Sequence, residues 1–104
     1  MEEYPLSKFV THGDYVQNLA TVFSVDSASA EPVVLTLEQV SELRTSPGQE
    51  HFSIVFRGPA DRLLSQGTYT LDHDRLGEQD LFIVPVAGDE QGISYEAVFN
   101  RLVS

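Results

Sequence analysis

The stretch from His51 to Val86 constrains the fold of this chain more than any other part of the sequence. Residues 51–58, 68–74 and 81–86 carry apolar side chains at alternate positions, and the connections between them are rich in Gly, Pro and Asp. Alternation with a period of two is typical of half-buried β-strands, and such connections are typical of turns. The stretch therefore predicts consecutive antiparallel strands at the centre of a mainly β fold.

The alternation also separates an inner from an outer face in each of these strands. The side chains expected to face the core are Phe52, Ile54, Phe56, Tyr69, Leu71, Leu81 and Ile83. In the third strand the other face is apolar too, with Phe82, Val84 and Val86. A strand that is apolar on both faces is either covered on both sides or carries an interface. Pro85 has no N–H to donate, so it indicates a sheet edge or the end of the strand.

The N-terminal part predicts one short helix, a strand and a loop. Residues 6–10 place apolar side chains at helical spacing, and Gly13 is expected to end that helix. Residues 21–25 alternate as in a strand. The small and polar residues 26–32 predict a loop.

Two interpretations are open for residues 33–43. Their first half alternates as in a strand, whereas Val40 and Leu43 follow at helical spacing. A bulge at residues 38–39 returns Val40 to the inner face of the strand, and this is the interpretation that we favour. A helix over residues 36–44 is the alternative, because the composition of that segment also suits a helix.

Turn signals separate the strands. Pro47 and Gly48 suit the two central positions of a type II turn, in which the second residue has a positive φ. Gly77 is the residue best able to adopt a positive φ in the turn after the second strand. Leu63 and Leu64 lie in a connection, and we expect both to fold back over an open end of the core.

A last strand is expected at residues 93–100, with Tyr95, Ala97 and Phe99 facing inward. The fold predicted for residues 1–104 is a single, mainly β domain of about six antiparallel strands in a small barrel or sandwich, with one short N-terminal helix. A barrel is favoured because closure removes the two exposed edges of an open sheet.

Composition argues against several classes of function. Sixteen acidic and six basic residues give a net charge of -10, which repels phosphate backbones and anionic membranes, so we expect no nucleic acid and no membrane as partner. The chain has no Cys, which excludes disulfides and thiolate metal sites. It shows neither a signal peptide nor an apolar run of about 18 residues, and we expect it to be cytoplasmic when made.

No pattern in the sequence indicates a catalytic centre, a metal or a cofactor. His73 lies between Asp72 and Asp74, but neighbours on a strand point to opposite faces, so we expect a turn with an ordinary His hydrogen bond. The serines lack the G-x-S-x-G context, and no phosphate-binding loop is present. The expectation is a protein without enzymatic activity.

Arg57 is the most suggestive polar residue, because it follows three alternating core residues and precedes Gly58. One hypothesis is an ion pair with Asp61 or Glu96 that holds the adjacent loop. The other is that Arg57 anchors a carboxylate of a partner protein.

Two functional classes fit the sequence. The first is an assembly or adaptor module in which the second apolar face contacts a protein partner or another copy. Its candidate interface residues are Val55, Arg57, Phe82, Val84, Val86 and Val98. The second is a small-ligand-binding barrel with a mouth lined by His51, Tyr69 and Tyr95. Assembly is favoured, because about six strands leave little room inside a barrel.

The run from Ser46 to Val86, followed by YEAVFN, resembles a family of small bacterial proteins of unknown function. The resemblance spans about residues 6–100 and is carried by Phe9, Gly13, Tyr15, Phe52, Ser53, Phe56, Arg57, Gly58, Pro59, Gly67, Tyr69, Leu71, His73, Leu76, Gly77, Phe82, Pro85, Tyr95, Glu96, Phe99 and Asn100. It implies genes near those of phage-tail-collar-like fibre proteins, and hence a structural role within a particle or fibre. The segment DSASAEP is longer than in the usual family pattern, so no role is carried over to it.

Overall fold

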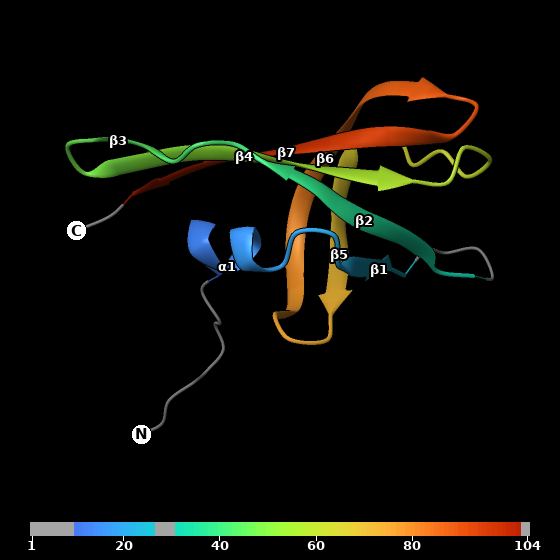
Figure 1. Ribbon diagram of the computed structural model, residues 1–104, viewed down its shortest axis with the longest axis horizontal. Helices are drawn as coiled ribbons and strands as arrows, with labels where there is room; N and C mark the ends of the chain where they lie inside the picture. Colours follow the sequence, from blue (N-terminus) through green and yellow to red (C-terminus); the bar gives the residue numbers. More distant parts are fainter. Residues whose placement is uncertain (1–9, 27–30, 103–104) are drawn as a thin grey trace.

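The computed structural model describes residues 10–26 and 31–102, which form a closed antiparallel β-barrel and one short helix (Figure 1). In chain order the elements are α1 (His12–Gln17), β1 (Val22–Val25), β2 (Val33–Val40), β3 (Arg44–Ser46), β4 (Gln49–Gly58), β5 (Gly67–His73), β6 (Gly77–Asp89) and β7 (Gly92–Leu102). The strand order is β2-β1-β5-β6-β7-β4-β3, and β2 also pairs with β4. This last pairing closes the barrel, as the sequence favoured, and leaves β3 outside it as an edge beside β4.

The inside of the barrel is filled with apolar side chains. Phe52, Ile54 and Phe56 are all buried, as the alternation in β4 predicts. Phe56 packs edge to face against Phe23 of β1, with ring centroids 5.1 Å apart. The side chains that are almost completely buried are Tyr15, Phe23, Val25, Val33, Leu35, Leu37, Ile54, Phe56, Leu71, Ile83 and Tyr95. Each large side chain of this kind contributes about 1.5–3 kcal/mol of burial free energy.

The expected bulge in β2 is present. Leu37 is opposite Phe56 and Gln39 is opposite Val55, so Glu38 is the extra residue in β2. The bulge lets Val40 pack against the core. The alternative helix over residues 36–44 is wrong, because β2 runs to Val40 and pairs with both β1 and β4.

Pro85 lies at a sheet edge, although β6 does not end there. Before it, β6 pairs with β5 as far as Ile83; from Val84 onward, β6 pairs with β7 instead. The part of β6 that contains Pro85 therefore has a strand on one side only, which suits a residue without an N–H. A second bulge lies between Pro85 and Ala87. In Figure 1, β6 bends: its first half runs across the direction of β4 and β7, and its second half lies alongside β7.

The helix begins later than the sequence analysis expected. Thr11 caps it: the Thr11 hydroxyl accepts from the Asp14 amide, and the Asp14 carboxylate accepts from the Thr11 amide. This reciprocal capping box starts the helix at His12, so Gly13 lies in its first turn and does not end it. The expected helical residues 6–9 and the loop residues 27–30 lie outside the described residues.

Both glycines expected to adopt a positive φ do so, at 76° for Gly48 and 77° for Gly77. Of the two leucines expected to cover the core, Leu64 is buried, whereas Leu63 is 67% exposed. Only one of two consecutive side chains can face the core in this extended connection. Within residues 10–26 and 31–102, no helix is long and apolar enough to cross a membrane.

Candidate protein-interaction surface

The outer surfaces of β6, β7 and β4 lie next to one another and carry the apolar residues that the sequence singled out. Glu96 of β7 is opposite Val84 of β6 on one side and Val55 of β4 on the other. We call Val55, Phe82, Val84, Val86 and Val98 the outer apolar face. The structure therefore brings Val55 and Val84 into one row across three strands.

Three members of the outer apolar face are more than half exposed: Phe82 at 53%, Val86 at 52% and Val98 at 63%. Phe82 is exposed because its neighbours Leu81 and Ile83 point into the barrel. Val86 is the extra residue of the β6 bulge. The alternation of the sequence predicted the exposure of these side chains, but the position of the bulge came only from the structure.

Glu96 occupies the middle of the row formed by Val84 and Val55. From the sequence, Glu96 was named as a possible partner of Arg57 and as one of the residues that carry the family resemblance. Its position on the outer side of β7 was implied by the alternation around Tyr95 and Ala97, but its neighbours were not. The row therefore holds one carboxylate between two apolar side chains.

Arg57 holds the hairpin between β6 and β7. Its Nη2 donates to Asp89 Oδ1 at 3.0 Å, and its Nη1 donates to Ser94 Oγ at 3.4 Å. Asp89 Oδ1 also accepts from the amides of Gln91 at 2.8 Å and Gly92 at 3.1 Å. The Gln91 amide, followed by the Arg57 charge, holds the pKa of Asp89 below its usual value.

The expected ion pair of Arg57 with Asp61 or Glu96 is therefore corrected to a pair with Asp89. The register decides this, because Arg57 is opposite Ser94, near the turn that joins β6 and β7. The turn is also sterically matched to Arg57: a Cβ on Gly92 would lie only 2.8 Å from Arg57 Nε. Arg57 consequently belongs to the support of the hairpin.

The three residues proposed for a ligand-binding mouth do not meet. His51 Nδ1 lies 2.6 Å from Asn100 Oδ1 at one end of β4. Tyr69 donates its hydroxyl to the carbonyl of Ser65 at 2.7 Å. Tyr95 is completely buried, and its hydroxyl accepts from the Leu64 amide at 2.9 Å. Tyr95 thus belongs to the core and anchors the connection that carries Leu64.

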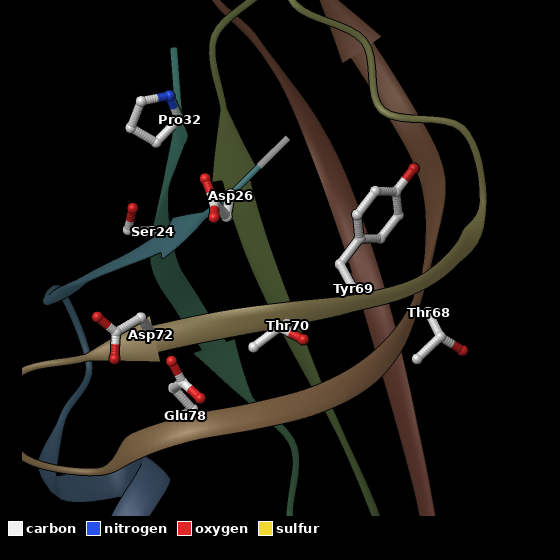
Figure 2. A pocket seen from close by; sticks show the side chains of 8 residues that line it. All are labelled: Ser24, Asp26, Pro32, Thr68, Tyr69, Thr70, Asp72 and Glu78. Carbon is white, nitrogen blue, oxygen red and sulfur yellow. The ribbon is translucent and has the colours of Figure 1, made fainter. Parts of the chain in front are cut away.

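A hollow of about 620 Å³ lies over β1, β5 and β6 (Figure 2). Ser24, Asp72 and Glu78 form a row across these strands. The residues that line the hollow are Ser24, Asp26, Pro32, Thr68, Tyr69, Thr70, Asp72 and Glu78. Sequence reasoning missed this surface, because it depends on which outward polar residues become neighbours. Among the described residues, no group of three or more His, Asp or Glu side chains is placed to hold a metal ion.

His73 forms the hydrogen-bonded turn that the sequence predicted. Its Nδ1 accepts from the amides of Arg75 at 3.0 Å and Leu76 at 3.2 Å. Its Nε2 lies 2.9 Å from Thr21 Oγ1, which itself donates to the Asn18 carbonyl. This arrangement needs a neutral imidazole that donates from Nε2. Burial, followed by the nearby Arg75 charge, lowers the pKa of His73.

Fold and surface together define a small closed β-barrel domain with an apolar patch on its outside. Residues 10–99 match a family described as a domain of unknown function, DUF6916. The match covers most of the chain, and the chain belongs to this family. No curated protein and no solved structure matches it. The resemblance to a family of unknown function is thereby confirmed.

Proposed function

We propose that this protein is a non-enzymatic assembly or adaptor module that acts through protein–protein contacts at its outer apolar face. The observation that carries the proposal is the exposure of Phe82, Val86 and Val98 by more than half on adjoining strands. Exposed apolar side chains on neighbouring strands are a feature of protein interaction sites. A partner that covers them gains about 1.5–3 kcal/mol for each large side chain that becomes fully buried.

The barrel supports this role because it presents these side chains on a fixed backbone. Val55 on β4 and Val84 on β6 each lie on a strand that pairs with β7, so little conformational entropy is lost when a partner binds. The interior of the barrel is filled by core side chains such as Phe23, Phe56 and Tyr95. A function carried by the outer surface therefore agrees better with this architecture than one carried by the inside.

The proposal includes a place for the protein as an accessory of a phage-tail-like or fibre-like particle. This part rests on the resemblance that implies neighbouring genes for fibre proteins. An accessory of that kind needs a stable body and a contact surface, and the barrel with its outer apolar face provides both. Pull-down of the tagged protein from its own cell lysate, followed by mass spectrometry, tests whether a particle or fibre component is captured.

A pair of surface variants tests the face itself. Phe82→Ser combined with Val98→Ser removes two exposed apolar side chains and should abolish capture of the partner without lowering the melting temperature. Val34→Ser on β2 is the matched control, because Val34 is also exposed, at 49%, but lies outside the outer apolar face. Equal capture by all three proteins would contradict the proposal.

The alternative is a small-ligand-binding barrel, and the hollow over β1, β5 and β6 is the observation that favours it. Asp26, Asp72 and Glu78 would give such a ligand an anionic environment (Figure 2). Calorimetric titration with small cationic compounds tests this alternative. Binding that is lost in Asp72→Asn, by a protein that captures no partner, would replace the assembly role.

A further inference from the structure

The C-terminal half of β7 has a strand on one side only. It pairs with β4 as far as Leu102, but its pairing with β6 ends at Glu96, where β6 turns toward β5. In Figure 1 the ends of β3, β4 and β7 project beyond the barrel above α1. We call this three-stranded part, residues 44–53 and 97–102, the overhang. Within the described residues, no strand covers the side of β7 that β6 has left.

The direction of the free backbone groups in β7 follows from Ser53 of β4. Both backbone groups of Ser53 face Ser41: its carbonyl accepts from the Ser41 amide at 2.8 Å, and its amide donates to Ser41 Oγ at 2.8 Å. Ser53 and its partner Val98 therefore form a non-hydrogen-bonded pair of the antiparallel ladder. By the alternation of such ladders, the N–H and C=O groups of Val98, Asn100 and Leu102 point to the free edge.

Two other free edges, that of β3 and that of the second half of β6, are protected against pairing with another chain, whereas the β7 edge is not. β3 is only three residues long, carries Arg44 and is followed at once by Pro47. The second half of β6, which pairs with β7 alone, contains Pro85 and a bulge. Short length, charge, proline and bulges are the devices by which natural sheets avoid edge-to-edge contacts. The β7 edge has neither proline nor bulge, since residues 97–102 contain no proline and pair regularly with β4, and its charged residue, Arg101, lies over the rings of Phe52 and Phe99.

The charge distribution also favours this edge for contact between two copies. Each chain carries a net charge of -10, yet residues 97–104 contain no acidic residue. Arg101, the basic residue of this segment, turns to the inner face, where its guanidinium lies 4.7 Å from the Phe99 ring centroid and 5.3 Å from that of Phe52. Two copies can therefore approach along this edge without bringing carboxylates of the segment together.

The sequence of the edge is complementary to itself. In an antiparallel pair of two β7 strands centred on Asn100, Val98 of one copy lies opposite Leu102 of the other, and Asn100 lies opposite its own counterpart. Val98 is 63% exposed and Leu102 is 84% exposed, so the pairing covers the two most exposed apolar side chains of β7. On the inner face, Phe99 lies opposite Arg101, a cation–π combination. An isologous contact requires this kind of self-complementarity.

We propose that two copies of this chain associate by antiparallel pairing of their β7 edges over residues 97–102, with the two-fold axis at Asn100. The free groups of Val98, Asn100 and Leu102 then form about six interchain hydrogen bonds, which join the two overhangs into one sheet. This inference rests on the proposed function as a protein–protein contact module. It names a second copy of the chain as the partner at the β7 edge and gives the register of the contact.

The decisive variant is Asn100→Pro. Proline removes an N–H that points to the free edge and leaves the ladder with β4 intact, because the odd-numbered residues of β7 supply that ladder. Thr45→Pro is the matched control: by the same alternation its N–H faces the free edge of β3. Analytical ultracentrifugation of the full chain, at concentrations up to about 0.1 mM, should give twice the 11.5 kDa chain mass for the wild type and Thr45→Pro. It should give the single mass for Asn100→Pro. Circular dichroism verifies that each variant is folded.

A charge pair tests the register. Val98→Asp combined with Leu102→Asp should abolish the dimer, because it places like charges opposite one another. Val98→Asp combined with Leu102→Arg should restore the dimer, since each aspartate then faces an arginine of the other copy. A wild-type monomer throughout this concentration range overturns the inference, and so does a dimer that survives Asn100→Pro. If the wild type is monomeric but still captures a lysate partner through Phe82, the inference fails and the proposed function stands.

Discussion

The barrel and the overhang are held together in different ways. In the barrel the strand pairings form a closed ring, and core residues such as Phe56 are fully buried. In the overhang the inner face is covered by α1, where the rings of Phe52 and Phe99 stack with centroids 4.6 Å apart and Tyr15 lies 5.5 Å from Phe99. The barrel is thus stabilised by a closed core. The overhang depends on a small aromatic cluster and a six-residue helix.

The barrel is therefore the rigid body of the protein, and the overhang is the part whose strand edge can pair with another chain. Closure of the barrel through the pairing of β2 with β4 removes the two free edges that an open sheet of the same strands would have there. The overhang leaves one strand edge open beside exposed apolar side chains. Protein contacts of both proposals are consequently expected on the side where β7 leaves the barrel.

The largest expected effect compares two phenylalanines on the inner faces of the two regions. Phe56→Ala should lower the free energy of unfolding by about 3–5 kcal/mol, because it leaves a cavity in a closed core. Phe99→Ala should cost about 1–2 kcal/mol, because Phe99 is only partly buried. Urea denaturation measures both values. Equal costs would show that the overhang is packed as firmly as the barrel.

The next largest effect is expected from substitution of Gly58 in the barrel, compared with Gly88 in the β6–β7 hairpin, and it tests how tightly the barrel is packed. A Cβ on Gly58 would lie 2.7 Å from Leu35 Cδ2 and 3.3 Å from Tyr95 Cε1, both inside the barrel. Gly58→Ala should therefore destabilise the protein by about 1–3 kcal/mol through overpacking. Gly88→Ala is the control, because its Cβ would lie 3.5 Å from the nearest atom, Ile93 Cγ1, at ordinary contact distance. Thermal denaturation should separate the two variants clearly, and similar melting temperatures would refute tight packing around Gly58.

His73 should make stability dependent on pH at the barrel end near β5. An unfolded histidine has a pKa near 6.5, and the pKa of His73 in the folded protein is lower. Between these two values the unfolded state binds more protons, so the free energy of unfolding falls as the pH decreases below about 6.5. His73→Asn, which keeps an acceptor and does not titrate, should weaken this decrease. Urea denaturation at several pH values measures it, and identical slopes for both proteins would disprove the role of His73.

The smallest expected effect is that of Arg57→Ala. The Arg57–Asp89 pair is largely exposed, so its loss should lower the melting temperature less than either core substitution. The difference should shrink further at high salt, because salt screens exposed charges. The mass in solution should stay unchanged, since Arg57 supports the β6–β7 hairpin. A change of mass with an unchanged melting temperature would instead assign Arg57 to an interface.

Much of the fold could be predicted from local patterns. The alternation around Ile54, the bulge at residues 38–39 and the turn at Pro47 and Gly48 each depend on residues close together in the chain. The helix was placed too early, because spacing alone does not show which residue caps it. The capping box of Thr11 and Asp14 decides its start.

The candidate site was predictable only in part. The alternation of apolar residues assigned Val84 and Val98 to the outside, and both lie there. The partner of Arg57 was not predictable, because Asp89 comes within reach only through the pairing of β4 with β7. The hypothesis of a ligand-binding mouth at His51, Tyr69 and Tyr95 depended on residue type alone, and the barrel places these side chains in three different environments.

The sequence alone determined which residues face inward, where the chain turns and that the fold is mainly β, because these properties follow from neighbours along the chain. The tertiary structure alone decided that β2 pairs with β4 to close the barrel and that Glu96 lies between Val84 and Val55. It also decided that β7 continues to Leu102 after its pairing with β6 has ended at Glu96. These features depend on the register between strands far apart in sequence. A shift of one residue in that register would change every one of these contacts and leave the local patterns as they are.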